Sequence, residues 1–150
     1  MKNIAHTVLF MIIALTLSAC TAAPGSGSAG NQGSIASPVS IGSYPVTSHA
    51  GTVDVFGINS GSSYYRVDGI SPGGTYTVSL TSTTGNVSLD VYDSSDFFTD
   101  TLCFDFAFDI VGDRTCTTST FGPVTGTSLY IEVSSDFNNT ATSNFNISVQ

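Results

Sequence analysis

The sequence predicts an all-β protein, an antiparallel, jelly-roll-like β-sandwich of about eight strands. Three observations predict this fold. Apolar and polar residues alternate in short runs after the N-terminal region, with the period of two that a half-buried strand shows. The runs are rich in Tyr, Val, Thr, Ile and Phe, which favour strands. Turn residues separate the runs. Because each run has one apolar and one hydroxyl-rich face, we expect two sheets that pack face to face.

The strands can be assigned in order along the chain. Alternation over 52–58 and 63–70 predicts two strands, and the Ser-Pro-Gly-Gly turn at 71–74 ends the second. The clearest pattern follows at 75–81, where tyrosine, valine and leucine point one way and threonine and serine point the other. Three later runs alternate in the same way: 87–92, 128–133 and 144–149.

The N-terminus has the layout of a secretory signal peptide. Lys2 precedes a short apolar run at 8–17, and small residues then lead to a cysteine. This run is too short for a transmembrane helix, which needs about 20 apolar residues. The final residues, Leu17-Ser18-Ala19-Cys20, resemble the lipobox of bacterial lipoproteins. The resemblance implies that residues 1–19 are removed and that Cys20 receives a diacylglyceryl group.

A lipidated Cys20 implies a place in the bacterial cell envelope. Stable anchoring needs more than one acyl chain, and a multiply acylated cysteine would hold the protein on the membrane through its lipid. Thr21, rather than aspartate, follows the cysteine and favours the outer membrane. Residues 20–42 are mostly small and polar, so we expect a lipidated N-terminus and a flexible, disordered linker. The remaining residues, 43–150, suit one small domain.

The charge of the chain excludes two classes of partner. After residue 19, Arg66 and Arg114 stand against eleven acidic residues, which gives a net charge of −9. Nucleic-acid binding needs a basic face that neutralises phosphates, and two arginines cannot build one. Attraction to an anionic membrane surface by charge is excluded for the same reason.

Two cysteines remain once Cys20 carries lipid. Cys103 and Cys116 form an even pair in an exported protein, where we expect a disulfide. A metal site would need further cysteine or histidine ligands nearby, and the sequence has none. A bridge across this short loop would stabilise the fold by roughly 3 kcal/mol.

Several motifs occur in a characteristic order: Tyr64-Tyr65-Arg66-Val67, the segments 73–80 and 85–92, the cysteines Cys103 and Cys116, and the segment 126–133. This order resembles the bacterial pre-peptidase C-terminal (PPC) domain, a small β-sandwich often found behind secreted peptidases. The likeness covers residues 51–149. It implies a non-catalytic module for secretion, surface retention or binding to polymers such as collagen and polysaccharide.

An aromatic run between the cysteines is the most unusual local feature. Phe104, Phe106 and Phe108 alternate with other residues, two of them aspartates, so the three rings would share one face of a strand. One interpretation is an extra strand whose phenylalanines complete the core. The other is an exposed platform that binds a partner protein or a sugar ring.

The polar residues give little support to metal binding or catalysis. Calcium takes six to eight oxygen ligands, and the acids that could supply them match no calcium-loop spacing: Asp93, Asp96, Asp100, Asp105, Asp109 and Asp113. Aspartate is also common in turns, so we assign no metal and no cofactor. His49 is the only histidine after the signal, and Glu132 is the only glutamate. A Ser-His-Asp triad would depend on that one histidine, and we expect no enzyme.

These observations predict a non-catalytic envelope lipoprotein whose sandwich mediates adhesion or protein interaction at the cell surface or in the periplasm. One alternative is a lipid-anchored carbohydrate-binding module. The absence of tryptophan disfavours it, because tryptophan is the largest ring for such contacts. A second alternative is a structural envelope protein that associates only with its own copies.

Overall fold

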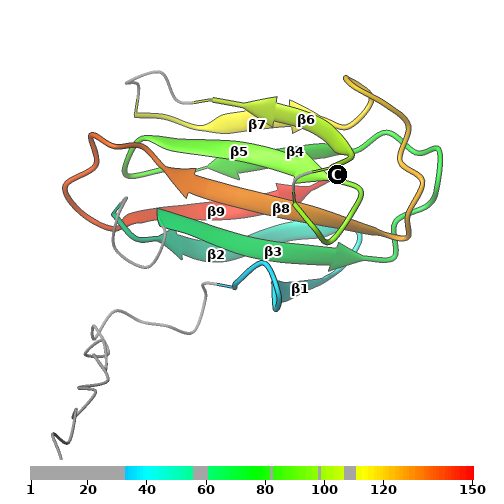
Figure 1. Cartoon of the computed structure of the whole chain (residues 1–150), viewed down its shortest axis with the longest axis horizontal. Coiled ribbons are helices and arrows are strands. Elements are labelled where there is room, and N and C mark those ends of the chain that lie inside the picture. Colours follow the sequence, from blue (N-terminus) through cyan, green and yellow to red (C-terminus); the bar gives the residue numbers. More distant parts are fainter. Residues whose placement is uncertain (1–32, 56–60, 82, 98, 107–110) are drawn as a thin grey trace, which may run out of the picture.

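The computed structural model describes residues 33–55, 61–81, 83–97, 99–106 and 111–150. These residues form nine β-strands in two packed sheets (Figure 1). The strands are β1 (Val39–Ser43), β2 (Val46–Val53), β3 (Ser62–Asp68), β4 (Thr77–Thr81), β5 (Val87–Tyr92), β6 (Thr101–Asp105), β7 (Arg114–Thr117), β8 (Ser128–Ser135) and β9 (Ser143–Val149).

The strand order is that of a jelly roll with one added strand. One sheet has the order β1-β3-β8-β5-β6, and the other has the order β2-β9-β4-β7. All pairs among β2 to β9 are antiparallel, and their order gives the two interlocking Greek keys of this fold. The predicted all-β sandwich is therefore confirmed, with nine strands among the described residues.

The core lies between the two sheets, where the apolar faces of the alternating strands meet. Val78 and Leu80 of β4 are fully buried, as are Leu129, Ile131 and Val133 of β8. The side chains between them in each strand point outward and are half-buried or exposed. The period-two alternation therefore assigned the inward and outward faces of these strands correctly.

Five of the six expected strands have bounds that differ from the expected ones, and the strand at 87–92 matches. The strand expected at 52–58 is β2, which begins at Val46 and ends at Val53. These bounds follow from its pairing with β9, in which Val46 lies opposite Val149 and Val53 lies opposite Ser143. Residues 56–58 lie outside the described residues. The strand expected at 75–81 begins at Thr77, since the backbone of Tyr76 bonds to Thr118 in the loop after β7.

Strand β1 corrects the expected extent of the linker. Its first four residues, 39–42, belong to the segment 20–42 that the composition assigned to a flexible spacer, and the strand pairs in parallel with β3. Val39 and Ile41 pack against the core. Two apolar residues among serine and glycine give no visible strand pattern, so the strand depends on its pairing with β3. Regular structure therefore begins before residue 43.

The expected lipid-bearing cysteine, Cys20, lies outside the described residues together with the expected signal peptide. The lipobox assignment therefore stays a prediction. Within the described residues, no helix has the length and apolar character needed to cross a membrane.

A disulfide and polar contacts join the two sheets at the β6–β7 edge. Cys103 of β6 and Cys116 of β7 form a disulfide, with their Cα atoms 5.7 Å apart. The carboxylate of Asp105 accepts a hydrogen bond from the backbone N–H of Thr115 at 2.9 Å. The buried Arg114 donates from Nε to the carbonyl oxygen of Val87 at 2.8 Å. The first two contacts hold the edge strand β6 against β7, and the third joins β7 to β5.

Candidate functional site

Three exposed phenylalanine rings lie along the β6 edge, and the middle ring, that of Phe104, contacts the other two. The exposed fractions of Phe104, Phe106 and Phe121 are 44%, 44% and 57%. The ring centroids of Phe104 and Phe106 are 4.5 Å apart. Those of Phe104 and Phe121 are 5.1 Å apart, with an interplanar angle of 20°. We call these three residues the aromatic ridge.

The sheet register places the first of these rings on the outer surface. Cys103 lies opposite Val91, points inward and reaches its disulfide partner in the other sheet. The next residue, Phe104, must point outward because successive side chains alternate between faces. Phe106 follows the last residue of β6 and lies beside Phe104. The strand geometry therefore brings these two rings together on the outside of the sheet.

Phe121 comes from the loop between β7 and β8, and hydrogen bonds fix the backbone of this loop. The N–H of Phe121 donates to the carbonyl of Leu102 at 3.1 Å, and the carbonyl of Val124 accepts from Gly73 at 2.8 Å. Val124 is itself buried. The backbone of this loop is therefore held at Phe121 and at Val124, so the loop itself needs little ordering when a partner binds.

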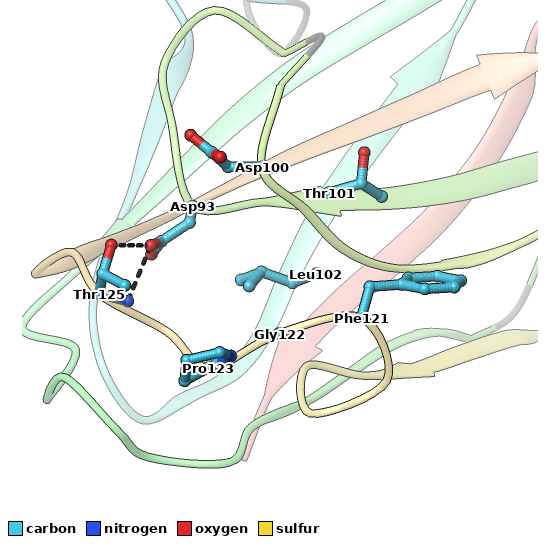
Figure 2. A pocket seen from close by; sticks show the side chains of 8 residues that line it. All are labelled: Asp93, Asp100, Thr101, Leu102, Phe121, Gly122, Pro123 and Thr125. Carbon is cyan, nitrogen blue, oxygen red and sulfur yellow. Dashed lines mark hydrogen bonds between the residues drawn. The ribbon is translucent and has the colours of Figure 1, made fainter.

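Asp93, the residue after β5, also fixes the β7–β8 loop, at Thr125 and Gly126 (Figure 2). Its Oδ2 accepts hydrogen bonds from the backbone N–H of Thr125 at 2.7 Å and from the Thr125 hydroxyl. Its Oδ1 accepts from the N–H of Gly126 at 3.0 Å. Asp93 thus bonds to two consecutive residues of the loop and is a main determinant of its conformation.

A pocket of about 270 Å³ lies between the β5–β6 loop and the β7–β8 loop (Figure 2). We call it the loop pocket. Asp93, Asp100, Thr101 and Leu102 come from the segment that joins β5 to β6 and from β6 itself, and Phe121, Gly122, Pro123 and Thr125 come from the β7–β8 loop. Phe121 belongs both to the pocket and to the aromatic ridge. The two features therefore form one continuous site.

A pair of carboxylates flanks the ridge on the outer face of the five-stranded sheet. Asp90 of β5 lies between Phe104 of β6 and Glu132 of β8 in the sheet register. The hydroxyl of Tyr92 donates to Oε2 of Glu132 at 3.3 Å. Burial, and then the charge of Glu132, raises the pKa of Asp90 to about 6. The outer face beside the ridge is therefore acidic, and its charge responds to pH.

A second group of aromatic rings on this face is structural. Phe97, in the β5–β6 loop, is 1% exposed and packs edge-on against Tyr64, Tyr92 and Tyr130, with centroids 4.8 to 5.7 Å away. It has a positive φ of 56°, which is uncommon outside glycine. Its ring fastens the loop that forms one wall of the loop pocket.

The structure distinguishes between the two interpretations of the aromatic run for two of its three phenylalanines. Phe104 and Phe106 lie at the surface, so the expectation that they complete the core is wrong for these two residues. Phe108 lies outside the described residues. Phe121 was not predicted, because it stands alone in a glycine- and threonine-rich loop and only the fold brings it to Phe104.

The aspartates in the loops have structural partners. Asp93 holds the β7–β8 loop, Asp96 accepts a hydrogen bond from the N–H of Thr99 at 3.0 Å, and Asp105 binds the start of β7. Asp109 lies outside the described residues. Across the part of the chain that is described, no three His, Cys, Asp or Glu side chains are grouped so that they could hold a metal ion.

His49, on which any catalytic triad would depend, packs as a structural residue. His49 lies on β2, and its ring contacts the ring of the buried Tyr65 with centroids 5.9 Å apart. Burial lowers the pKa of His49. The loop pocket and the aromatic ridge belong to another part of the sandwich, since neither β2 nor its neighbour β9 contributes a residue to them.

The chain matches no protein-family model and no curated protein. Among solved structures, it is similar to the pre-peptidase C-terminal domain of a collagenase from Bacillus anthracis. The TM-score is 0.53 and the identity 13%, over 75% of this chain and 94% of that one. It is also similar to PliG of Aeromonas hydrophila, a periplasmic inhibitor of g-type lysozyme, with a TM-score of 0.41 and 11% identity over 75% of this chain and 96% of that one. The first likeness shows the fold alone, as expected from the sequence motifs, and the second is too distant to support an inference.

Proposed function

We propose that this chain is a non-catalytic lipoprotein of the bacterial envelope, anchored in the outer membrane through Cys20, whose sandwich binds a partner protein through the aromatic ridge. The observation that carries the proposal is the contact between three exposed rings on a fixed edge of the fold. Isolated exposed apolar residues are common on monomers, but contiguous exposed apolar patches mark contact sites. Buried aromatic residues supply much of the binding energy in protein interfaces.

The position of the ridge supports display away from the anchor. The described chain begins next to β1, at one edge of the five-stranded sheet, and β6 forms the opposite edge (Figure 1). Four inter-strand spacings of about 4.8 Å place the ridge roughly 19 Å from β1. A linker that enters at β1 therefore leaves the ridge open to a partner.

The disulfide supports an exported location. Cys103 and Cys116 have the separation of a normal bridge, and such bridges persist in oxidising compartments such as the periplasm. This agrees with the signal-peptide layout of residues 1–19.

The composition of the loop pocket supports a binding role without catalysis. Among the described residues that line it, the ionisable groups are Asp93 and Asp100. Asp93 already accepts three hydrogen bonds that hold the neighbouring loop, so a role as general base would compete with its structural one. Thr101 and Thr125 lack a neighbouring histidine or lysine in the pocket lining that could activate a hydroxyl.

The geometry of the three rings favours a protein, rather than a carbohydrate, as the binding partner of the ridge. A sugar stacks on an open aromatic face, whereas the ring of Phe104 contacts both Phe106 and Phe121. Together the rings form an apolar ridge suited to a groove or pocket on a partner. Association with further copies of this chain is disfavoured, because two bodies of net charge −9 repel each other.

A capture experiment tests the proposal. The full chain, purified from a bacterial host in mild detergent, serves as bait for a cross-linked envelope extract and is also applied to a polysaccharide array. The test variant is the double substitution Phe104→Ser and Phe121→Ser. The matched control is Phe137→Ser, which removes a ring that is 76% exposed from the β8–β9 loop, outside the ridge and the loop pocket. Circular dichroism verifies that each variant folds.

We expect a protein that the wild type and the Phe137→Ser control capture equally and that the double variant does not capture. Capture that is insensitive to the double substitution would rule out the ridge as the binding surface. Binding to polysaccharide with no ridge-dependent protein would replace the proposal with the carbohydrate-binding alternative.

A further inference from the structure

We infer that the partner of the ridge is a basic protein and that the loop pocket receives one of its arginine side chains. The inference rests on the proposed function, because it names the chemistry of the partner that the ridge would contact. Three observations support it: the shape of the pocket, the carboxylates around it, and the bonds that the protein's own arginines make outside the pocket.

The pocket suits a long side chain with an apolar stem. Leu102, which is 2% exposed, lies at its base. Pro123 and Phe121 form the wall opposite the β5–β6 loop (Figure 2). These groups would cover the methylene groups of an inserted arginine, whose stem packs on apolar surface while its head stays polar. The volume of about 270 Å³ is just below the roughly 300–1,000 Å³ of pockets for drug-sized ligands, so one side chain fits better than a larger molecule.

The pocket carries negative charge that no described cation neutralises. Asp93 and Asp100 contribute carboxylates, and none of the described lining residues is basic. Arg66 forms an ion pair with Asp68 on β3, with Nε and Oδ1 3.1 Å apart. Arg114 is buried and donates to the carbonyl of Val87. Both arginines of the described chain are therefore engaged away from the pocket, and a cation must come from a partner.

Further acids lie on the other side of the ridge. Asp90 is opposite Phe104 in the register and is followed across the sheet by Glu132. A partner seated on the ridge thus meets carboxylates both in the loop pocket and on the sheet face. The net charge of −9 adds a long-range field that steers basic proteins and disfavours acidic ones.

Arginine fits these groups better than lysine does. Hydrogen bonds from Thr125 and Gly126 hold the carboxylate of Asp93 in place, and its Oδ1 can accept one more bond. A planar guanidinium has several N–H donors in a fixed arrangement, so it can bond to two separate carboxylates and stack on an aromatic ring, while an ammonium is a compact and strongly hydrated charge. The combination of Asp93, Asp100 and the ring of Phe121 therefore selects a guanidinium.

A titration with defined peptides tests the inference independently of any cellular partner. The isotope-labelled full chain in detergent is titrated with acetyl-Leu-Arg-amide, and the amide signals of Thr125 and Gly126 are followed by NMR. The citrulline peptide, which is nearly isosteric and neutral, and the lysine peptide serve as comparison ligands. The test variant is Asp100→Asn. Asp113→Asn is the matched control, since Asp113 is exposed and lies before β7, outside the pocket.

We expect the arginine peptide to shift both amide signals and to bind about tenfold more tightly than the citrulline peptide, as expected when a charge-assisted pair is lost. Asp100→Asn should weaken arginine binding about fivefold, and Asp113→Asn should leave it unchanged. Equal binding of the arginine and citrulline peptides, equal binding of the lysine peptide, or no shift at Thr125 and Gly126 would overturn the inference.

The outcomes separate this inference from the proposed function. A ridge-dependent partner together with no preference for arginine would overturn the inference and leave the proposed function intact. A clear preference for arginine without any ridge-dependent protein would support the chemistry of the pocket and contradict the proposed function.

Discussion

The ring of Phe121 stacks on the ring of Phe104, with centroids 5.1 Å apart and planes 20° from parallel. The two residues belong to different parts of the fold. Phe104 lies on the edge strand β6 of one sheet, and Phe121 follows β7 of the other sheet. Their contact exists because the β7–β8 loop crosses back over the edge and bonds to Leu102. The exposed aromatic surface is thus a product of the tertiary structure.

Substitution in the aromatic ridge should cost little stability, whereas substitution of the buried Phe97 in the β5–β6 loop should cost much more. Phe106→Ser removes a ring that is 44% exposed, and we expect a loss of about 1 kcal/mol or less. Phe97→Ala removes a ring that is 1% exposed and contacts three tyrosines, and we expect a loss of about 3–5 kcal/mol. Urea denaturation measures both. Equal losses would show that Phe106 contributes to the core.

Loss of the disulfide should destabilise the fold. The bridge between Cys103 and Cys116 spans a sequence separation of 13, and closure of such a loop contributes roughly 3 kcal/mol. We expect the double variant Cys103→Ala and Cys116→Ala to unfold at a correspondingly lower urea concentration. Thiol labelling of the denatured wild type provides the control, because labelling at both cysteines would show that the bridge had not formed.

Asp90 should make the protein less stable as the pH rises through the range 4 to 6. Burial and the charge of Glu132 raise its pKa from 3.8 to about 6. Between these values the folded chain retains a proton that the unfolded chain has lost, so the free energy of unfolding falls with pH. Asp90→Asn should remove this dependence and add about 1 kcal/mol of stability at pH 7.5, after allowance for solvent screening.

Urea denaturation of wild type and Asp90→Asn at pH 4, 5, 6 and 7.5 measures this difference. The two proteins should agree at pH 4 and diverge above it, with the variant the more stable. Parallel stability curves over the whole range would show that Asp90 is not the group responsible.

The lipid anchor makes a separate prediction. If Cys20 is acylated, the wild-type protein should sediment with membranes, and its N-terminal peptide should have the mass of a lipidated cysteine. Each buried methylene contributes about 0.8 kcal/mol, so Cys20→Ala should release the protein from the membrane. Sedimentation of the variant together with an unmodified wild-type Cys20 would rule out the anchor.

Alternation predicted the strands whose two faces differ in polarity. In β4, β5, β8 and β9, apolar residues alternate with serine, threonine, asparagine, tyrosine or acidic residues, and the apolar positions are buried. The same signal is too short in β1, where Val39 and Ile41 are the only apolar residues, and this strand pairs with β3. Its parallel pairing depends on which edge of the sheet is free, and a local pattern carries no such information.

The candidate site was only partly predictable. The density of phenylalanine marked Phe104 and Phe106 as unusual, but the pattern did not show which face of the edge strand they occupy. The sequence did not indicate the roles of Phe121 and Asp93, because these roles depend on the β7–β8 loop returning to the β6 edge. Asp90 and Glu132 are likewise neighbours because β8 lies next to β5 in the sheet. Alternation within single strands does not determine this strand order.

Site-specific photo-cross-linking tests the central claim most directly. p-Benzoylphenylalanine replaces Phe121 in one strain and the exposed Phe137 in a control strain, and living cells are irradiated before the envelope is analysed. A protein-binding ridge predicts one discrete polypeptide adduct from position 121 that is absent from position 137. No adduct at position 121, or the same adducts from both positions, would contradict the account.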